Sequence, residues 1–248
     1  MRRMDPKKRD ILEATVVGQA IQIFRDEVRA RQRGEAPANR PFVAISREFG
    51  CEGTDLAVSL AEALNKGPAS GSGPEWQYYD RALLDRLAED HDLKVEAVRS
   101  AEEHHRTEIE QYLSKELSKR PDDYDVYQYL VSAITTLAKR GNVIFVGRGA
   151  HIITQTFGTG FYVRLYGSPQ FKVKRIRDCM PDISDDVDAV ASFIGKESKK
   201  RDSFIERFTL KSPSDPLYYH LMINNGKFSV PEMTQLVLGG MKCRGIPV

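Results

Sequence analysis

The stretch Pro41–Asp55, PFVAISREFGCEGTD, decides the fold. Its apolar first half, Phe42–Ser46, predicts a buried strand. A glycine-bearing turn follows, and Thr54 opens an amphipathic segment that predicts a helix as far as Asn65. A strand, a glycine turn and a helix N-terminus in this order can bind an anion, because the first backbone N–H groups and the helix dipole both favour negative charge there.

The turn differs from an ordinary phosphate-binding loop at one position. Gly53 stands directly before Thr54, where such a loop carries a lysine. Gly50 and Gly53 can take a positive φ and let the backbone approach a phosphate. Thr54 is suited to cap the helix or to place its hydroxyl on Mg²⁺. Arg47 is a candidate source of the missing positive charge, and a plain strand-to-helix turn is the alternative interpretation.

The rest of the chain alternates between apolar strands and amphipathic helices. Further strands are expected at Trp76–Tyr79, Asn142–Val146, Phe161–Tyr166 and Tyr219–Asn224. Helices are expected at Arg81–Arg140 with a break at Lys119–Asp123, and at Pro169–Cys179, Val187–Phe208 and Val230–Leu238. Strands separated by helices predict a three-layer α/β/α architecture with a mainly parallel, five-stranded sheet. In such sheets ligands bind beyond the carboxyl ends of the strands.

An N-terminal segment precedes this alternation. Lys7–Arg33 carries apolar side chains at helical spacing, and the Gly- and Pro-bearing Gly34–Pro41 reads as a linker. The helix either docks on the main domain or pairs two chains in a homodimer. The expected organisation is an N-terminal helix and linker at 1–40 and a main domain at 41–248, with a helical insertion at about 81–140 and a lid at about 180–210.

Composition excludes several classes of protein. The formal net charge of +2 argues against a dedicated nucleic-acid binder, which is usually strongly basic. Cys51, Cys179 and Cys243 are odd in number and far apart, so we expect neither a disulfide framework nor a zinc site, and a reducing cytoplasm is the expected location. No apolar run approaches the roughly 20 residues of a membrane span, so no membrane association is expected.

Two other strand ends and a pair of basic helices carry further candidate residues. Gly141–Gly149, GNVIFVGRG, ends an apolar strand in Gly-Arg-Gly, and the Arg148 guanidinium suits bidentate binding of phosphate or carboxylate. Asp80 ends another strand and either orients a substrate or caps a helix. The basic helices at 170–177 and 195–208, joined by an acidic connector, predict a hinged lid over phosphates. Surface ion pairs and solvated helix faces are the alternatives.

Four motifs together resemble the cytidylate kinase-like family, a divergent branch of the P-loop nucleoside monophosphate kinases. They are AISREFGCEGTDLA, YYDRALL, VIFVGRGA with VRLYGSPQFKVKRI, and KRDSFIERF followed by YYHLMINNGKFS. The resemblance runs from Phe42 to about Leu238. It implies a P-loop nucleotide kinase fold that uses ATP and Mg²⁺. The loop residues that the resemblance assigns to phosphate-donor binding are Gly50, Cys51, Glu52, Gly53 and Thr54.

The resemblance also assigns residues outside the loop. It implies that Asp80 and Arg148 bind the acceptor, that Arg175 packs near the adenine, and that Arg201 reaches the transferring phosphates. We expect Arg201, Lys200 and Arg47 to supply the charge of the absent lysine. Two further departures from the family pattern are Ser198 and His220, each at a position where the branch usually has Asp.

The sequence therefore predicts a phosphotransferase. Its phosphate would come from ATP, and its acceptor would be a nucleoside monophosphate or a similar small phosphorylated molecule. The alternative is a non-catalytic nucleotide- or anion-sensing regulatory protein on a kinase scaffold, which the absent lysine and the N-terminal helix motivate. A structural oligomer with an empty cleft is a third interpretation.

Overall fold

The structure is a computed structural model that describes residues 40–68, 73–89, 121–184 and 186–248, with Gln22, Arg25, Asp26, Arg29 and Arg33. The chain divides into two compact units. One unit, called here the sheet unit, comprises residues 40–80 and 141–248. The other unit includes residues 81–140. The domain boundaries expected from the sequence remain a prediction.

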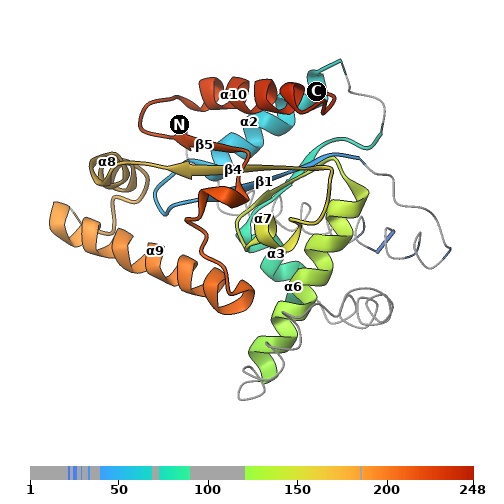
Figure 1. Ribbon diagram of the computed structural model, residues 1–248. Helices are drawn as coiled ribbons and strands as arrows, with labels where there is room; N and C mark the ends of the chain where they lie inside the picture. The colour runs from blue at the N-terminus through green and yellow to red at the C-terminus, as the bar shows by residue number, and fades with distance from the viewer. Residues whose placement is uncertain are drawn as a thin grey trace. The chain divides into compact units, whose positions relative to one another are not determined.

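The sheet unit is built on five strands in the order β2-β3-β1-β4-β5, counted over the described residues (Figure 1). The strands are β1 Phe42–Arg47, β2 Gln77–Tyr79, β3 Val143–Val146, β4 Gly160–Tyr166 and β5 Leu221–Asn224. Every pairing is parallel, so the expected α/β class with a five-stranded sheet is confirmed. The carboxyl ends of β1, β3 and β4 consequently meet at one edge of the sheet.

Helices follow the strands as the sequence pattern predicts. Those of the sheet unit are α2 Gly53–Lys66, α7 Ala150–Ile153, α8 Pro169–Cys179, α9 Val187–Thr209 and α10 Val230–Cys243. The last strand begins at Leu221 rather than Tyr219, because a 3₁₀ turn at Pro216–Tyr218 precedes it. The last helix runs past Leu238 to Cys243.

The two faces of the sheet bury different side chains because successive residues of a strand point to opposite sides. Val43 and Ile45 belong to one apolar cluster with Leu56 and Leu60 of α2 and with residues of α10. These two helices lie together over that face in Figure 1. Phe42 points the other way, where its ring meets the rings of Phe145, Phe157 and Tyr162, each at 6.1 Å.

The second unit contains α3 Arg81–Glu89 and α6 Pro121–Arg140, which pack against each other. Proline is favoured at the first position of a helix, which explains why α6 begins at Pro121, inside the predicted break. In the predicted N-terminal helix, Gln22 and Asp26 share a hydrogen bond of 3.0 Å at helical spacing. The rest of that helix, with its predicted homodimer contact, lies outside the described residues, as do residues 90–120. None of the described helices is long and apolar enough to cross a membrane.

Candidate functional site

The loop between β1 and α2 is held in a conformation that requires glycine. Gly50 has φ +91°, and a Cβ there would stand 3.0 Å from the Cβ of Lys172. The loop turns tightly, since the Cys51 N–H donates to the Glu48 carbonyl at 3.3 Å. The helix then begins at Gly53. The N–H groups of its first turn have no acceptor within the helix, so this end of α2 presents donors to an anion.

Arg47 extends across the place where a lysine would stand. A Cβ on Gly53 would lie 3.0 Å from the Arg47 Cγ and 3.1 Å from its Cδ. Farther along the same side chain, one guanidinium nitrogen lies 1.9 Å from the position that a Cβ on Gly147 would take. Two glycines on two different segments therefore make room for Arg47. Its positive charge lies at the carboxyl ends of β1 and β3.

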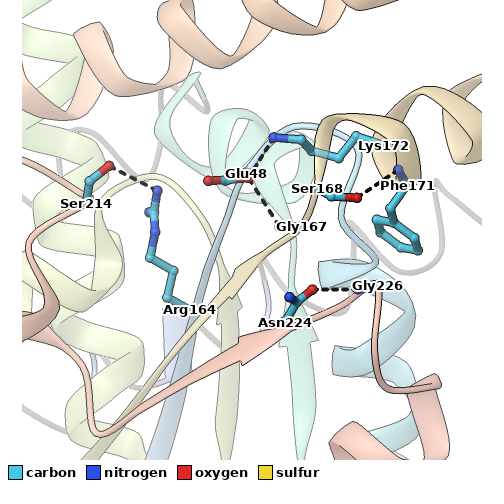
Figure 2. Close-up of polar contacts among 9 residues, drawn as sticks. All are labelled: Glu48, Arg164, Gly167, Ser168, Phe171, Lys172, Ser214, Asn224 and Gly226. Atoms are coloured by element: carbon cyan, nitrogen blue, oxygen red, sulfur yellow. Dashed lines mark hydrogen bonds and ion pairs between the residues drawn. The ribbon is translucent and has the colours of Figure 1, made fainter.

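Cations of the helix α8 pair with the acidic residues of the loop and of the first turn of α2. The Glu48 carboxylate accepts from the Lys172 ammonium at 2.7 Å and from the Gly167 N–H at 3.3 Å, as Figure 2 shows. Arg175 lies between two other acids, 2.7 Å from Asp55 and 3.6 Å from Glu52. The structure thus places Arg175 beside the loop, paired with Glu52 and Asp55. Two cations of α8 therefore offset most of the charge of three carboxylates, and Arg175 is shared between two of them.

Asn225 joins the loop to the end of β5. Its side-chain oxygen accepts from the Glu52 N–H, and its side-chain nitrogen donates to the Glu52 carboxylate, both at 2.7 Å. Such a reciprocal pair fixes both the backbone and the side chain of Glu52. The loop is therefore held from two sides, by α8 and by the segment after β5.

The Gly-Arg-Gly motif forms a turn with three consecutive positive φ angles. They are +87° at Gly147, +53° at Arg148 and +71° at Gly149. An arginine in this region is costly, which indicates that surrounding contacts hold it there. The Arg148 guanidinium lies over the ring of Phe204 on α9, 4.5 Å from its centroid. Asp80 reaches the same edge of the sheet, because β2 pairs with β3 through Tyr79 and Phe145.

The helix α9 brings one of its two predicted catalytic cations to the loop. The Arg201 guanidinium lies over the ring of Phe49, 4.7 Å from the centroid. Lys200 is not brought to the loop: its side chain is 73% exposed and pairs with Glu197 of the same helix at 2.5 Å. Asp202 comes next, and burial raises the pKa of its carboxyl while the positive charge of Arg164 opposes that rise.

Cys51 and Thr54, two of the predicted loop residues, differ in their exposure to solvent. Cys51 is buried in the apolar cluster beneath α2, and burial raises the pKa of its thiol to about 11. Its sulfur is therefore a neutral thiol within the apolar core. Thr54 is exposed in the first turn of α2, while Glu52 stands at the cap position. The Thr54 hydroxyl is thus not the helix cap, and its exposed place suits a metal ligand.

The sequence singled out Lys172 as part of a basic helix and Asn225 as part of a strand end, but it did not single out Arg164 and Asp202, which the structure also brings to this edge. Lys172 and Asn225 hold the loop, and Arg164 and Asp202 lie on facing elements. One signal was present in the sequence: Arg164 is a charged residue inside the apolar strand FYVRLY. The contact partners of Lys172 and Asn225 are 124 and 173 residues away in the sequence, so no local pattern indicates which groups these two residues bind.

Comparisons with known proteins bear on the family and the fold of this chain. The model of the cytidylate kinase-like family matches residues 42–227. A crystal structure of an uncharacterized protein from Eubacterium ventriosum ATCC 27560 has a TM-score of 0.64 at 22% identity, over 82% of this chain and 99% of that chain. No protein with a curated description matches the chain.

A solved shikimate kinase from Bacteroides thetaiotaomicron is a weaker match, with a TM-score of 0.42 at 15% identity over 82% of this chain and 97% of that chain. The Eubacterium ventriosum protein shares the fold. The family match extends from the first residue of β1 past the end of β5. On that match, the chain belongs to the cytidylate kinase-like family.

Proposed function

We propose that this chain is a phosphotransferase that moves a phosphoryl group from ATP to a nucleoside monophosphate or a similar small phosphorylated acceptor. The observation that carries the proposal is the path of Arg47. Its side chain passes Gly53, the position of the absent lysine, and its guanidinium lies against Gly147. Membership of a cytidylate kinase-like family supports the same activity.

The residues of the donor loop fit a nucleotide phosphate. Gly50, with its positive φ, and the first turn of α2 present backbone N–H groups to an anion. The exposed hydroxyl of Thr54 would hold Mg²⁺, and Arg175 would pack near the adenine. When bound, ATP supplies the phosphoryl group and Mg²⁺ offsets its charge. Everything else is positioning and electrostatics by the protein, since phosphoryl transfer needs little covalent help.

The acceptor would bind beside β2 and β3, between Asp80 and Arg148. A guanidinium at a turn between two glycines can approach a phosphate with two parallel N–H donors. Arg47 and Arg201 would then stabilise the charge that develops between donor and acceptor. We expect such an enzyme to use free nucleotides in the cytoplasm.

The test measures ADP release with ATP, Mg²⁺ and a panel of nucleoside monophosphates, together with ATP binding by calorimetry. We expect Arg47→Met to lower turnover about 100- to 1,000-fold, the usual loss for one donor aimed at the transition state. Arg47→Lys should retain part of the activity, because it keeps the charge. Arg244→Met, an exposed position after α10, is the matched control and should leave turnover unchanged.

One result would contradict the role of Arg47 and another would contradict the activity itself. Unchanged turnover in Arg47→Met would show that a group other than Arg47 replaces the lysine. Tight ATP binding without ADP release across the whole panel would favour the regulatory alternative, a nucleotide sensor on a kinase scaffold.

A further inference from the structure

Arg164 is a charged side chain buried within the sheet unit. It lies on β4 and is 4% exposed. Its neighbours Val163 and Leu165 face the cluster with α2, so Arg164 leaves the sheet on the opposite face. Its register partner there is Ser46 of β1. Figure 2 shows the guanidinium extending from β4 toward Ser214.

All the hydrogen-bond partners of Arg164 are neutral hydroxyls. One guanidinium nitrogen donates to Ser46 at 3.0 Å and to Tyr219 at 3.4 Å. The other donates to Ser214 at 3.3 Å. Two of these three bonds are longer than the usual N–H···O distance of about 2.9–3.0 Å. Among the described residues, no carboxylate lies within ion-pair distance of Arg164.

A buried guanidinium without a carboxylate partner is unusual, because burying an unpaired charge is costly. Asp202, on the helix α9, has a carboxyl group that interacts electrostatically with Arg164 at longer range. Burial raises the pKa of Asp202, and the charge of Arg164 acts against that rise. The same segment of α9 carries Arg201 and the ring beneath Arg148. Arg164 therefore lies among the groups of the candidate site without belonging to any ion pair of the described residues.

We propose that Arg164 binds an oxyanion, the phosphate or carboxylate group of the acceptor, on the face of the sheet opposite α2. The assignment to the acceptor rests on the proposed function. The anion replaces Ser214 and Tyr219 as the acceptor of the long hydrogen bonds from Arg164, while the shorter hydrogen bond to Ser46 keeps the guanidinium oriented. A guanidinium offers an oxyanion two parallel charge-assisted bonds, which are stronger than bonds to hydroxyls. Asp202 competes with the anion for the same positive charge.

The test uses the whole chain and inorganic phosphate as the probe. Thermal unfolding is followed against phosphate concentration, with chloride added to keep the ionic strength constant. All proteins also carry Arg47→Met, which weakens phosphate binding at the donor loop. Acetate in place of phosphate distinguishes a carboxylate site from a phosphate site. A ligand that binds the folded state alone raises the unfolding temperature as its concentration passes its dissociation constant.

We expect Arg164→Met to weaken phosphate binding about 10- to 100-fold, the range for a lost hydrogen-bonding charge. Asp202→Asn should strengthen binding roughly fivefold, because it removes a partly screened negative charge. Without phosphate, Arg164→Met should unfold at the same or a higher temperature, since replacing an unpaired buried charge by an apolar side chain is often stabilising. A purely structural arginine would give the opposite result, a lower unfolding temperature with unchanged phosphate affinity, and that would overturn the proposal.

Two further variants keep the test informative if Arg164→Met does not fold. Arg164→Lys keeps the charge but has a single donor nitrogen, so it cannot form two parallel bonds to the anion and phosphate binding should weaken. Ser214→Ala frees a guanidinium donor, so binding should stay equal or strengthen. The reverse pattern would overturn the proposal. The failure of this inference can be distinguished from the failure of the proposed function. If the protein releases ADP but Arg164 variants bind phosphate as tightly as the parent protein, only this inference is refuted. If Arg164 variants bind phosphate more weakly but the protein releases no ADP, only the phosphotransferase is refuted.

Discussion

Arg47 and Gly53 should be energetically coupled, and a double-mutant cycle can measure the coupling. Gly53→Ala adds a methyl group 3.0 Å from the Arg47 Cγ and 3.1 Å from its Cδ. Replacing glycine by alanine in a helix gains about 0.5–1 kcal/mol by propensity alone. Inserting a methyl group into a packed site costs about 1–3 kcal/mol. In the wild-type protein, therefore, Gly53→Ala should lower the free energy of unfolding.

The same substitution should have the opposite sign when Arg47 is alanine. The next neighbour, a methyl group of Val146, would be 3.4 Å from the added Cβ, an ordinary contact distance. Only the helix propensity then remains, so Gly53→Ala should stabilise the Arg47→Ala protein by up to about 1 kcal/mol. The difference between the two backgrounds is a coupling free energy of about 1–3 kcal/mol.

The assay is urea unfolding of the four proteins without nucleotide. Gly149→Ala is the control, because its φ of +71° makes alanine unfavourable and its added Cβ would lie near Thr209 and Ile205 rather than near Arg47. If Gly53→Ala changes the free energy of unfolding by the same amount in both backgrounds, within about 0.5 kcal/mol, then Arg47 does not fill the lysine position and the argument fails.

Two other predictions concern buried titratable groups. His151 has its pKa lowered from 6.5 to about 3 by burial, so the unfolded chain takes up a proton first as the pH falls. The free energy of unfolding should be highest well above pH 6.5 and should fall as the pH is lowered from there to about pH 3. By pH 5 the loss should be about 2 kcal/mol, measured by urea titration. The variant His151→Gln should not show this loss. The Cys51 thiol is buried with a raised pKa, whereas Cys179 and Cys243 are exposed. A thiol-specific reagent at pH 8 should therefore label the two exposed cysteines in the folded protein and Cys51 only after unfolding. Rapid labelling of native Cys51 would contradict its place in the core.

The local parts of the site could be predicted from the sequence, because their signals lie within a few residues of each other. The apolar run Phe42–Ser46, its glycine turn and the helix after it follow directly from composition. The Gly-Arg-Gly sequence at Gly147–Gly149 likewise indicates a strand end followed by a turn, and the structure has positive φ angles there. These segments need only their own residues to specify a strand, a turn and a helix start.

The contacts between segments could not be predicted in this way. Lys172 and Glu48 are 124 residues apart, and nothing in either helix or loop indicates their pairing. Neighbouring cations on a helix also face different directions: Arg201 lies over Phe49 while Lys200 pairs with Glu197. Successive residues are about 100° apart around a helix, so only the packed orientation of α9 decides which one reaches the loop.

The Glu52–Asn225 pair makes the donor loop one of the last parts of the protein that synthesis can complete. The two residues are 173 positions apart. At about 5–20 residues per second, a ribosome needs roughly 10–35 s between them. During that interval the first strand, the turn and α2 exist without the amide that fixes Glu52. A growing chain thus carries the sequence of this loop long before it can hold the loop in its final conformation, which needs the residue that follows the last strand.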